Sequence, residues 1–147
     1  MAETSQRVDP FRTFNFRVEI SGTTTASFRE CSGLSTDGDA VDYREGLDPN
    51  TMRKLPGLRK YANVTLKRGY TQNLELWGWY ANITNGIPDR RTVSIVLMNE
   101  GQDDVLRWEL AFAWINKIEG ASFNAGASEV AVESLEIVHE GLTLVVP

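Results

Sequence analysis

The side chains able to act as nucleophiles or metal ligands are few in this 147-residue sequence, and their spacing fits no known site. The only histidine, His139, precedes Glu140, but a metalloprotease helix needs a second histidine four residues on, where Thr143 stands. The only cysteine, Cys31, is far from His139 in the chain, so a zinc site of the usual type lacks ligands. The sequence therefore predicts no metal site, and His139 is expected to be structural or exposed.

Serines and carboxylates also fall outside catalytic patterns. Ser32 and Ser35 lack the two flanking glycines of a nucleophile elbow. Glu100, Asp103 and Asp104 sit in a short turn without the spacing of a calcium loop. The remaining candidates are Glu129, Glu133, Glu136 and Glu140. Nothing in the sequence sets two of them across a cleft, as a glycosidase requires. We expect no enzyme activity and no cofactor.

Cations gather in one stretch of the chain, with two tyrosines near them. They are Arg53, Lys54, Arg59, Lys60, Lys67 and Arg68, with Tyr61 and Tyr70. Such a set can contact phosphate and stack on bases. The whole chain, however, carries a net charge of -5 and a pI of about 4.9, which disfavours nucleic-acid affinity. A charged protein interface is the favoured interpretation, without specific nucleic-acid binding.

Four tryptophans offer a second candidate function, a carbohydrate-binding β-sandwich module. Trp108 and Trp114 belong to an apolar alternation that predicts a core strand, whereas Trp77 and Trp79 fall on a predicted helix. Packing explains all four positions. The sugar-binding module is kept as the alternative.

Composition places these residues in one domain of modest size. A chain of this length buries roughly 70% of its unfolded surface, so it holds a core without disulfides. Residues 1–10 are polar and predict a flexible arm, and no apolar run reaches the roughly 20 residues of a membrane span. We expect a protein made in the cytoplasm that does not insert into a membrane as a monomer.

Apolar and polar residues alternate along most of the chain, which is the pattern of half-buried strands. The expected strands are 14–20, 26–32, 41–43, 61–69, 91–99, 106–115 and 130–138. The fold class is thus mainly β: a single-domain β-sandwich or squat barrel of antiparallel strands, spanning 1–147. In 106–115, Leu106, Trp108, Leu110, Phe112 and Trp114 are predicted to share the core face.

One segment changes to helical spacing and predicts an α-helix at about 71–82. Gly78 inside it costs about 1 kcal/mol relative to alanine. Its presence suggests close packing beneath Trp77 or Trp79.

The segment 44–60 is predicted to be an extended loop between strands. It carries five cations but also Leu55, Pro56 and Leu58, so it is too apolar for a plain solvated tip. We expect another molecule to pack on it.

This loop and other motifs resemble the inner-tube proteins of contractile phage tails and of related contractile injection systems. The matching pieces run in order along the chain: Cys31-Ser32-Gly33-Leu34, Tyr43-Arg44-Glu45-Gly46, Arg53-Lys54-Leu55-Pro56-Gly57-Leu58, Leu66-Lys67-Arg68-Gly69 and Ala131-Val132-Glu133. The apolar tail from Thr143 to Pro147 departs from the family pattern.

The resemblance implies a structural subunit that forms hexameric rings stacked into a hollow tube. Its implied partners are other copies of itself, a contractile sheath, baseplate or spike and tube-terminator proteins, and DNA or protein cargo in the lumen. It also implies a mature location in a virion tail or an injection particle. Six copies at -5 each would carry -30, and the part facing a lumen would repel DNA.

Within this framework the loop 44–60 is the expected contact between rings. The predicted contact residues are Tyr43, Arg44, Glu45, Gly46, Arg53, Lys54, Leu55, Pro56, Gly57, Leu58, Arg59 and Lys60. Their apolar members would dock in a neighbour's groove, and their cations would meet its acidic rim.

Overall fold

The computed structural model describes residues 15–21, 23–24, 28–47, 49–69, 74–121, 123–126 and 131–147. The elements are β1 (Phe16–Ile20), β2 (Thr23–Thr24), β3 (Glu30–Ser32), β4 (Thr36–Tyr43), β5 (Arg53–Tyr61), β6 (Val64–Gly69), α1 (Glu75–Thr84), β7 (Arg91–Met98), β8 (Asp104–Glu119), β9 (Val132–Val138) and β10 (Gly141–Val145). The prediction of a mainly β chain with one helix is confirmed. The predicted arm, 1–10, lies outside the described residues.

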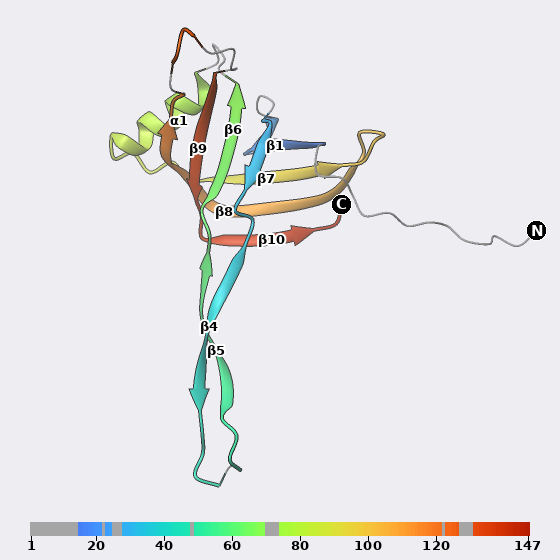
Figure 1. Cartoon of the computed structure of the whole chain (residues 1–147), viewed down its shortest axis with the longest axis vertical. Helices are drawn as coiled ribbons and strands as arrows, with labels where there is room; N and C mark the ends of the chain where they lie inside the picture. The colour runs from blue at the N-terminus through green and yellow to red at the C-terminus, as the bar shows by residue number, and fades with distance from the viewer. Residues whose placement is uncertain are drawn as a thin grey trace, which may run out of the picture.

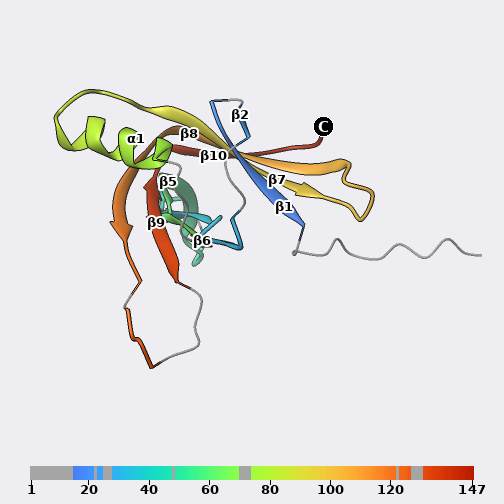
Figure 2. The same ribbon diagram turned by 90° about the horizontal axis from the view of Figure 1, so that it is seen from above.

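The strands form one large antiparallel sheet and one separate hairpin (Figure 1). The large sheet runs β2-β1-β7-β8-β9-β6-β3, with β10 paired to β8. Within the described residues, the two end strands of this path, β2 and β3, do not pair with each other. The sheet is therefore not closed into the squat barrel that the sequence left as an alternative. Figure 2 shows α1 near one end of β7 and β8 and the turn between these strands at the other.

Strand β8 joins the two halves of the sheet because it changes partners along its length. Its first part pairs with β7 and β10, and its last part, from Trp114, pairs with β9. Between them the β7–β8 register shifts and Phe112 has a φ of 52°, a left-handed conformation that is rare for a bulky residue. Such a bulge bends a strand and lets it turn a corner between sheets.

The bulge also changes which face of β8 points inward, and this corrects the prediction of a single core face. Leu110 is buried, but Phe112 is 59% exposed, and Ala113 and Ile115 are buried after it. The simple alternation from Leu106 to Trp114 is therefore wrong beyond Leu110. A non-local requirement, the turn between two sheet halves, overrides the local period.

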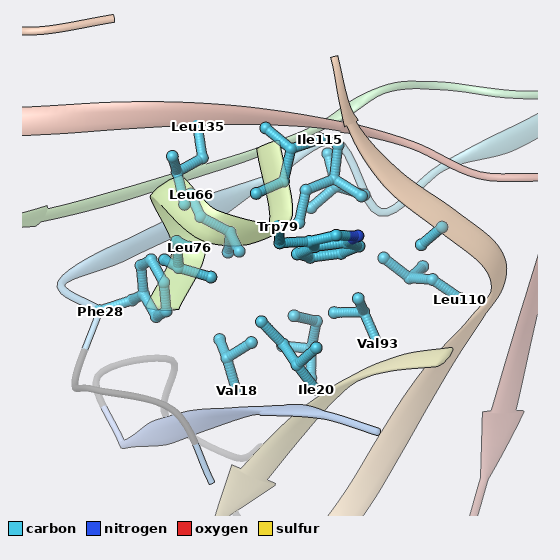
Figure 3. Close-up of a cluster of buried hydrophobic side chains, with 14 residues drawn as sticks. Val18, Ile20, Phe28, Leu66, Leu76, Trp79, Val93, Leu110, Ile115 and Leu135 are labelled. Atoms are coloured by element: carbon cyan, nitrogen blue, oxygen red, sulfur yellow. The ribbon is translucent and has the colours of Figure 1, made fainter. Parts of the chain in front are cut away.

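The core lies between the two halves of the sheet and is closed on one side by α1 (Figure 3). Leu76 and Trp79 of the helix are buried among residues of β1, β6, β7, β8 and β9. The indole Nε1 of Trp79 donates to the carbonyl of Asp89 at 2.7 Å, which satisfies its polar atom. Each fully buried aliphatic or aromatic side chain contributes about 1.5–3 kcal/mol.

The helix differs from its predicted bounds and from the packing predicted around Gly78. It begins at Glu75 and ends at Thr84, whereas 71–82 was expected, and 71–73 lie outside the described residues. A β-carbon added at Gly78 would meet nothing within 4 Å. Gly78 itself faces open space, so the close packing expected beneath Trp77 or Trp79 is found only at Trp79, which is buried, and does not depend on this glycine.

The predicted loop 44–60 is a loop only in part. Residues Arg53–Tyr61 form strand β5, paired antiparallel with β4, and the true turn region is the stretch between the two strands. The hairpin projects away from the body as a long arm (Figure 1). Local composition, with Pro56 and Gly57 in the middle, favoured a loop. Cross-strand pairing with β4 makes it a strand.

The apolar tail also contains a strand that the sequence reading missed. Residues Gly141–Val145 form β10, which pairs with β8 from Gly141↔Ala111 to Val145↔Arg107. It follows β9 after two residues and lies along the same edge of β8. The tail is thus an edge strand of the large sheet.

Candidate assembly surface

Exposed apolar side chains gather on the β4–β5 hairpin. Of the thirteen large hydrophobic residues that are exposed in the described part of the chain, six lie here: Val41, Tyr43, Leu47, Met52, Leu55 and Leu58. Leu47, in the turn, is 99% exposed. Contiguous exposed apolar surface of this kind marks an interaction site.

The register of the hairpin explains how these residues lie together. Val41 pairs with Leu55 and Tyr43 with Arg53, and residues opposite one another in an antiparallel pair share a face. The neighbouring pair, Asp42 and Lys54, points to the other side. One face of the hairpin near its tip therefore carries Val41, Leu55 and Tyr43 together with Arg53, and the other carries the Asp42–Lys54 pair.

Two of the four cations predicted to meet an acidic neighbour, Lys54 and Lys60, have partners within the hairpin. Lys54 Nζ lies 2.6 Å from Asp42 Oδ1, and Lys60 Nζ lies 3.4 Å from Asp39 Oδ2. All four side chains are largely exposed, so each pair contributes little to stability. Residues 36–61 hold five acidic and five basic side chains, so the hairpin has no net positive charge to offer an acidic neighbour.

Two further contacts shape the hairpin. Tyr43 donates its hydroxyl to Glu45 at 2.5 Å, and this hydrogen bond raises the pKa of Tyr43. A β-carbon at Gly57 would lie 2.6 Å from the carbonyl oxygen of Asp39, so only glycine fits where the β4–β5 register shifts. The close approach of the β4 backbone thus explains the glycine of the Pro56-Gly57 motif.

The base of the hairpin is tied to the body by the buried His139. Its Nε2 lies 3.0 Å from the carbonyl oxygen of Ala62, directly after β5, and its Nδ1 lies 3.0 Å from that of Gly141. The ring also contacts Tyr61, with centroids 5.5 Å apart. The prediction of a structural histidine agrees with this geometry, in which both ring nitrogens face backbone carbonyls.

A groove about 290 Å³ in volume opens on the body between β3 and the inner face of the β1–β7–β8 half of the sheet. Its lining is Phe16, Arg29, Glu30, Cys31, Leu34, Ile95, Leu97 and Trp108. Most of these side chains are apolar. Burial raises the pKa of the Cys31 thiol to about 11. Sequence reasoning missed the groove, because its residues come from four separate elements.

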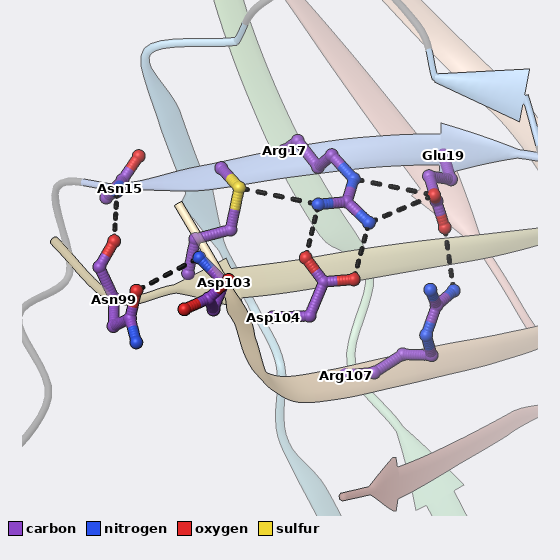
Figure 4. A network of polar contacts seen from close by, with 8 residues as sticks. Asn15, Arg17, Glu19, Asn99, Asp103, Asp104 and Arg107 are labelled. Carbon is purple, nitrogen blue, oxygen red and sulfur yellow. Dashed lines mark hydrogen bonds and ion pairs between the residues drawn. The ribbon is translucent and has the colours of Figure 1, made fainter. Parts of the chain in front are cut away.

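The opposite face of the same sheet half carries a network of paired charges (Figure 4). Arg17 Nη2 donates to Asp104 at 2.7 Å, and Arg107 Nη1 donates to Glu19 at 2.7 Å. The hydrogen bonds from Arg17 hold the pKa of Asp104 below its ordinary range. Asp104 is therefore an ion-pair partner across β1 and β8, where the sequence suggested a solvated turn.

One member of the predicted cationic cluster is not on the surface. Arg68 is 2% exposed, and its Nε lies 2.6 Å from Oε1 of Glu133, which is 3% exposed. The Arg68 guanidinium also lies 5.7 Å from the ring centroid of Phe28. The pair joins β6 to β9 at Arg68↔Glu133. Neither residue is available to a partner, which corrects the grouping of Arg68 with the exposed cations.

The described residues supply little for the alternative functions. They contain no group of three or more His, Cys, Asp or Glu residues that could hold a metal ion. No helix within the described ranges is long and apolar enough to cross a membrane. Trp79 is buried, and only Trp77, at 46%, is well exposed among the four tryptophans. Trp79 is therefore a packing residue, as the sequence predicted.

The chain is similar to known proteins over nearly its whole length. The model of the T4-like virus tail tube protein family, gp19, matches residues 12–143. A chain from the tube-terminating cap of the anti-feeding prophage is 25% identical, with a TM-score of 0.81 over 100% of both chains. No curated protein sequence matches the chain.

Two further solved structures have the same fold at lower identity. A chain of the extended sheath–tube complex of PVC, an extracellular contractile injection system, is 23% identical, with a TM-score of 0.79 over 94% of this chain and 93% of that one. Hcp1 from Flavobacterium johnsoniae is 13% identical, with a TM-score of 0.55 over 89% of this chain and 94% of that one.

Proposed function

Because the chain belongs to the T4-like virus tail tube protein family, we propose that its copies form hexameric rings that stack into the hollow tube of a contractile tail or injection particle. The whole chain, 1–147, is then one tube domain. The β4–β5 hairpin is the axial contact between successive rings. The subunit works mechanically: sheath contraction drives the tube forward, and the lumen conducts DNA or protein cargo.

The proposal of an axial contact rests on the structure of the hairpin. An isolated two-stranded hairpin is marginally stable in water, and this one exposes Val41, Tyr43 and Leu55 on one face of its arm. Contact with another copy would bury that face. The surface therefore needs a partner, and a tube supplies one for every subunit except those at one end.

Open strand edges support the lateral association within a ring. The described sheet path ends at β2 and β3, and β10 lies at an edge beside β8. Exposed edges pair readily with another chain, and head-to-tail pairing about an axis closes a ring. A related structure, the baseplate of the anti-feeding prophage, was determined with 6-fold symmetry. A hexamer is the corresponding expectation here.

The proposed partners follow the relatives' assemblies. These include a sheath–tube complex, a baseplate, and a tube-terminating cap. For this chain we assign a contractile sheath around the tube, a baseplate or spike at one end and a terminator at the other. The subunit would be made in the bacterial cytoplasm and would catalyse no reaction.

Charge reversal at the hairpin tests the axial role. We expect Arg53→Glu with Lys54→Glu to leave single rings intact but to abolish stacking, because it removes the Lys54–Asp42 pair and places four like charges on one short segment with Asp42 and Glu45. Negative-stain microscopy of the purified protein distinguishes rings from tubes.

The matched control is Lys117→Glu, which reverses an exposed cation on β8 away from the hairpin. It should form tubes of normal length. Normal tubes from the hairpin variant would refute the axial assignment. A wild-type protein that stays monomeric at high concentration would refute the tube function itself, and a tryptophan fluorescence response to glycans would then favour the sugar-binding alternative.

A further inference from the structure

One half of the large sheet, made of β1, β7, β8 and β10, has two faces of different character. On one face, Val18, Ile95 and Leu110 are buried in the core. The body of the subunit lies on this side, as Figure 2 shows for β6 and β9. The other face carries the network of ion pairs (Figure 4). This half of the sheet is therefore a wall with the body on one side and charges on the other.

The ion pairs cross the wall and cover its middle strand. Arg17 of β1 donates to Asp104 at the start of β8. Arg107 of β8 donates to Glu19 of β1. Both bridges pass over β7, because β7 lies between these two strands. Val96 of β7 pairs in register with both arginines and is fully buried. The charged side chains thus form the surface of this face and neutralise one another.

The net charge of this face is small. Glu109 also lies on it, because Ser94 pairs in register with Glu19 on one side and with Glu109 on the other. The paired-charge face is thus defined by Arg17, Glu19, Asp104, Arg107 and Glu109. Two cations and three anions give it -1 per copy, against -5 for the whole chain. In a ring of six copies it would contribute -6 of the total of -30.

Both sides of the wall offer an edge to another copy. Within the described residues, β1 pairs with β2 at two positions only, Glu19 and Ile20. In the same part of the chain, β10 pairs with β8 alone. Edge-to-edge pairing that repeats around an axis closes a cylinder. The four strands of this wall, repeated in six copies at about 4.8 Å spacing, give a circumference of about 115 Å and a diameter of about 37 Å.

The size of the body decides which face of this cylinder points inward. A domain of this length has a radius of gyration of about 15 Å. Six such bodies do not fit inside a cylinder about 37 Å wide. The bodies must therefore lie outside it, which turns the opposite face of the wall toward the axis.

We propose that the paired-charge face lines the lumen of the tube and makes its wall nearly neutral, so that a protein cargo of either charge sign passes without adhering. The inference rests on the proposed tube function. It differs from the sequence-based expectation of a lumen that repels DNA, because most of the negative charge lies on other surfaces. DNA carries one negative charge per about 1.7 Å and would meet little repulsion from this wall.

Removing the two arginines tests the placement and the neutrality together. Arg17→Gln with Arg107→Gln changes the face from -1 to -3 per copy, which is -18 per ring. Tubes of this variant should take up small cationic gold clusters, seen in electron micrographs as a line of particles along the tube axis. Wild-type tubes should hold at least tenfold fewer clusters.

A second variant leaves both bridges intact. Glu109→Lys changes the face from -1 to +1 per copy and should draw anionic gold clusters into the lumen. The matched control is Lys117→Glu, which changes the charge by -2 per copy, as the double arginine variant does, at an exposed position in the last part of β8. Its lumen should hold no more clusters than the wild-type lumen.

The outcomes separate this inference from the function on which it rests. Clusters of the matching sign that bind only the outer surface of the variant tubes, or not at all, would overturn the lumen placement and leave the tube function standing. Clusters that line the wild-type lumen as densely would overturn the neutrality of the wall. If the wild-type protein forms no tubes, the function and the inference fail together.

Discussion

Single residues in this chain serve packing and assembly in ways that their types alone do not reveal. Gly33 has a φ of 94°, and a β-carbon there would lie 2.1 Å from the carbonyl oxygen of Asn63. Glycine is the residue that tolerates both conditions. The Cys31-Ser32-Gly33-Leu34 motif therefore reflects a close backbone approach between the β3–β4 and β5–β6 connections.

The buried Arg68–Glu133 pair yields a stability prediction at the residue scale. Arg68→Met should destabilise the fold by roughly 3–5 kcal/mol, because Glu133 is left as an uncompensated buried charge. Adding Glu133→Leu should recover most of that loss. Urea denaturation followed by circular dichroism measures the free energy of unfolding.

The neighbouring Lys67 provides the control for this prediction. Lys67→Met removes an exposed cation that lies 3.8 Å from Glu30, and it should cost less than about 1 kcal/mol. Equal effects of the two substitutions would show that the buried pair is not responsible. A double variant as unstable as Arg68→Met would contradict the uncompensated-charge explanation.

At the scale of elements, the hairpin and β8 differ in how many neighbouring strands hold them in place. Strand β8 is held by β7, β9 and β10, and it accepts a strained Phe112 because those neighbours determine its path. The hairpin strands β4 and β5 pair only with each other in the described structure. We therefore expect contact with another copy to stabilise them.

Hydrogen exchange should report this difference. In isolated rings of the Arg53→Glu, Lys54→Glu variant, the amides of β4 and β5 should exchange quickly, because a two-stranded hairpin opens readily. In wild-type tubes the same amides should be protected by at least tenfold. Mass spectrometry of proteolytic peptides covering 36–61 measures both rates.

The amides of β9 supply the internal reference for this experiment. They lie in the centre of the large sheet, between β8 and β6, and should be protected in both samples. Equal protection of the hairpin in rings and in tubes would mean that the next ring does not order it.

At the scale of the whole molecule, the proposed docking of the β4–β5 hairpin on the next ring makes the subunit polar along one direction. A ring that can receive a hairpin but cannot dock its own should end a growing tube. We therefore expect a small fraction of the Arg53→Glu, Lys54→Glu variant rings, mixed with wild-type rings, to shorten tubes as that fraction rises.

Tube length in negative-stain images tests this expectation. Mixing in Lys117→Glu rings at the same fraction should leave the length distribution unchanged. A mixture in which the hairpin variant has no effect on length would show that stacking does not pass through a single head-to-tail contact.

Much of the architecture follows from the sequence because it depends on local patterns. Alternating apolar residues indicated most strands, the change of period indicated α1, and the motifs around Cys31 and Pro56 indicated the tube family. The apolar residues within 44–60 indicated a contact surface. Each of these signals is contained in a short stretch of chain, where side-chain period and turn residues report directly on structure.

The tertiary structure alone decided the features that join distant segments. Cross-strand pairing made 53–60 a strand, and the turn between the two sheet halves reversed the faces of β8 at Phe112. Burial withdrew Arg68 from the surface, and four separate elements created the groove beside Cys31. A local pattern cannot encode these outcomes, because the packing energy of each residue depends on neighbours that only the folded chain brings within contact.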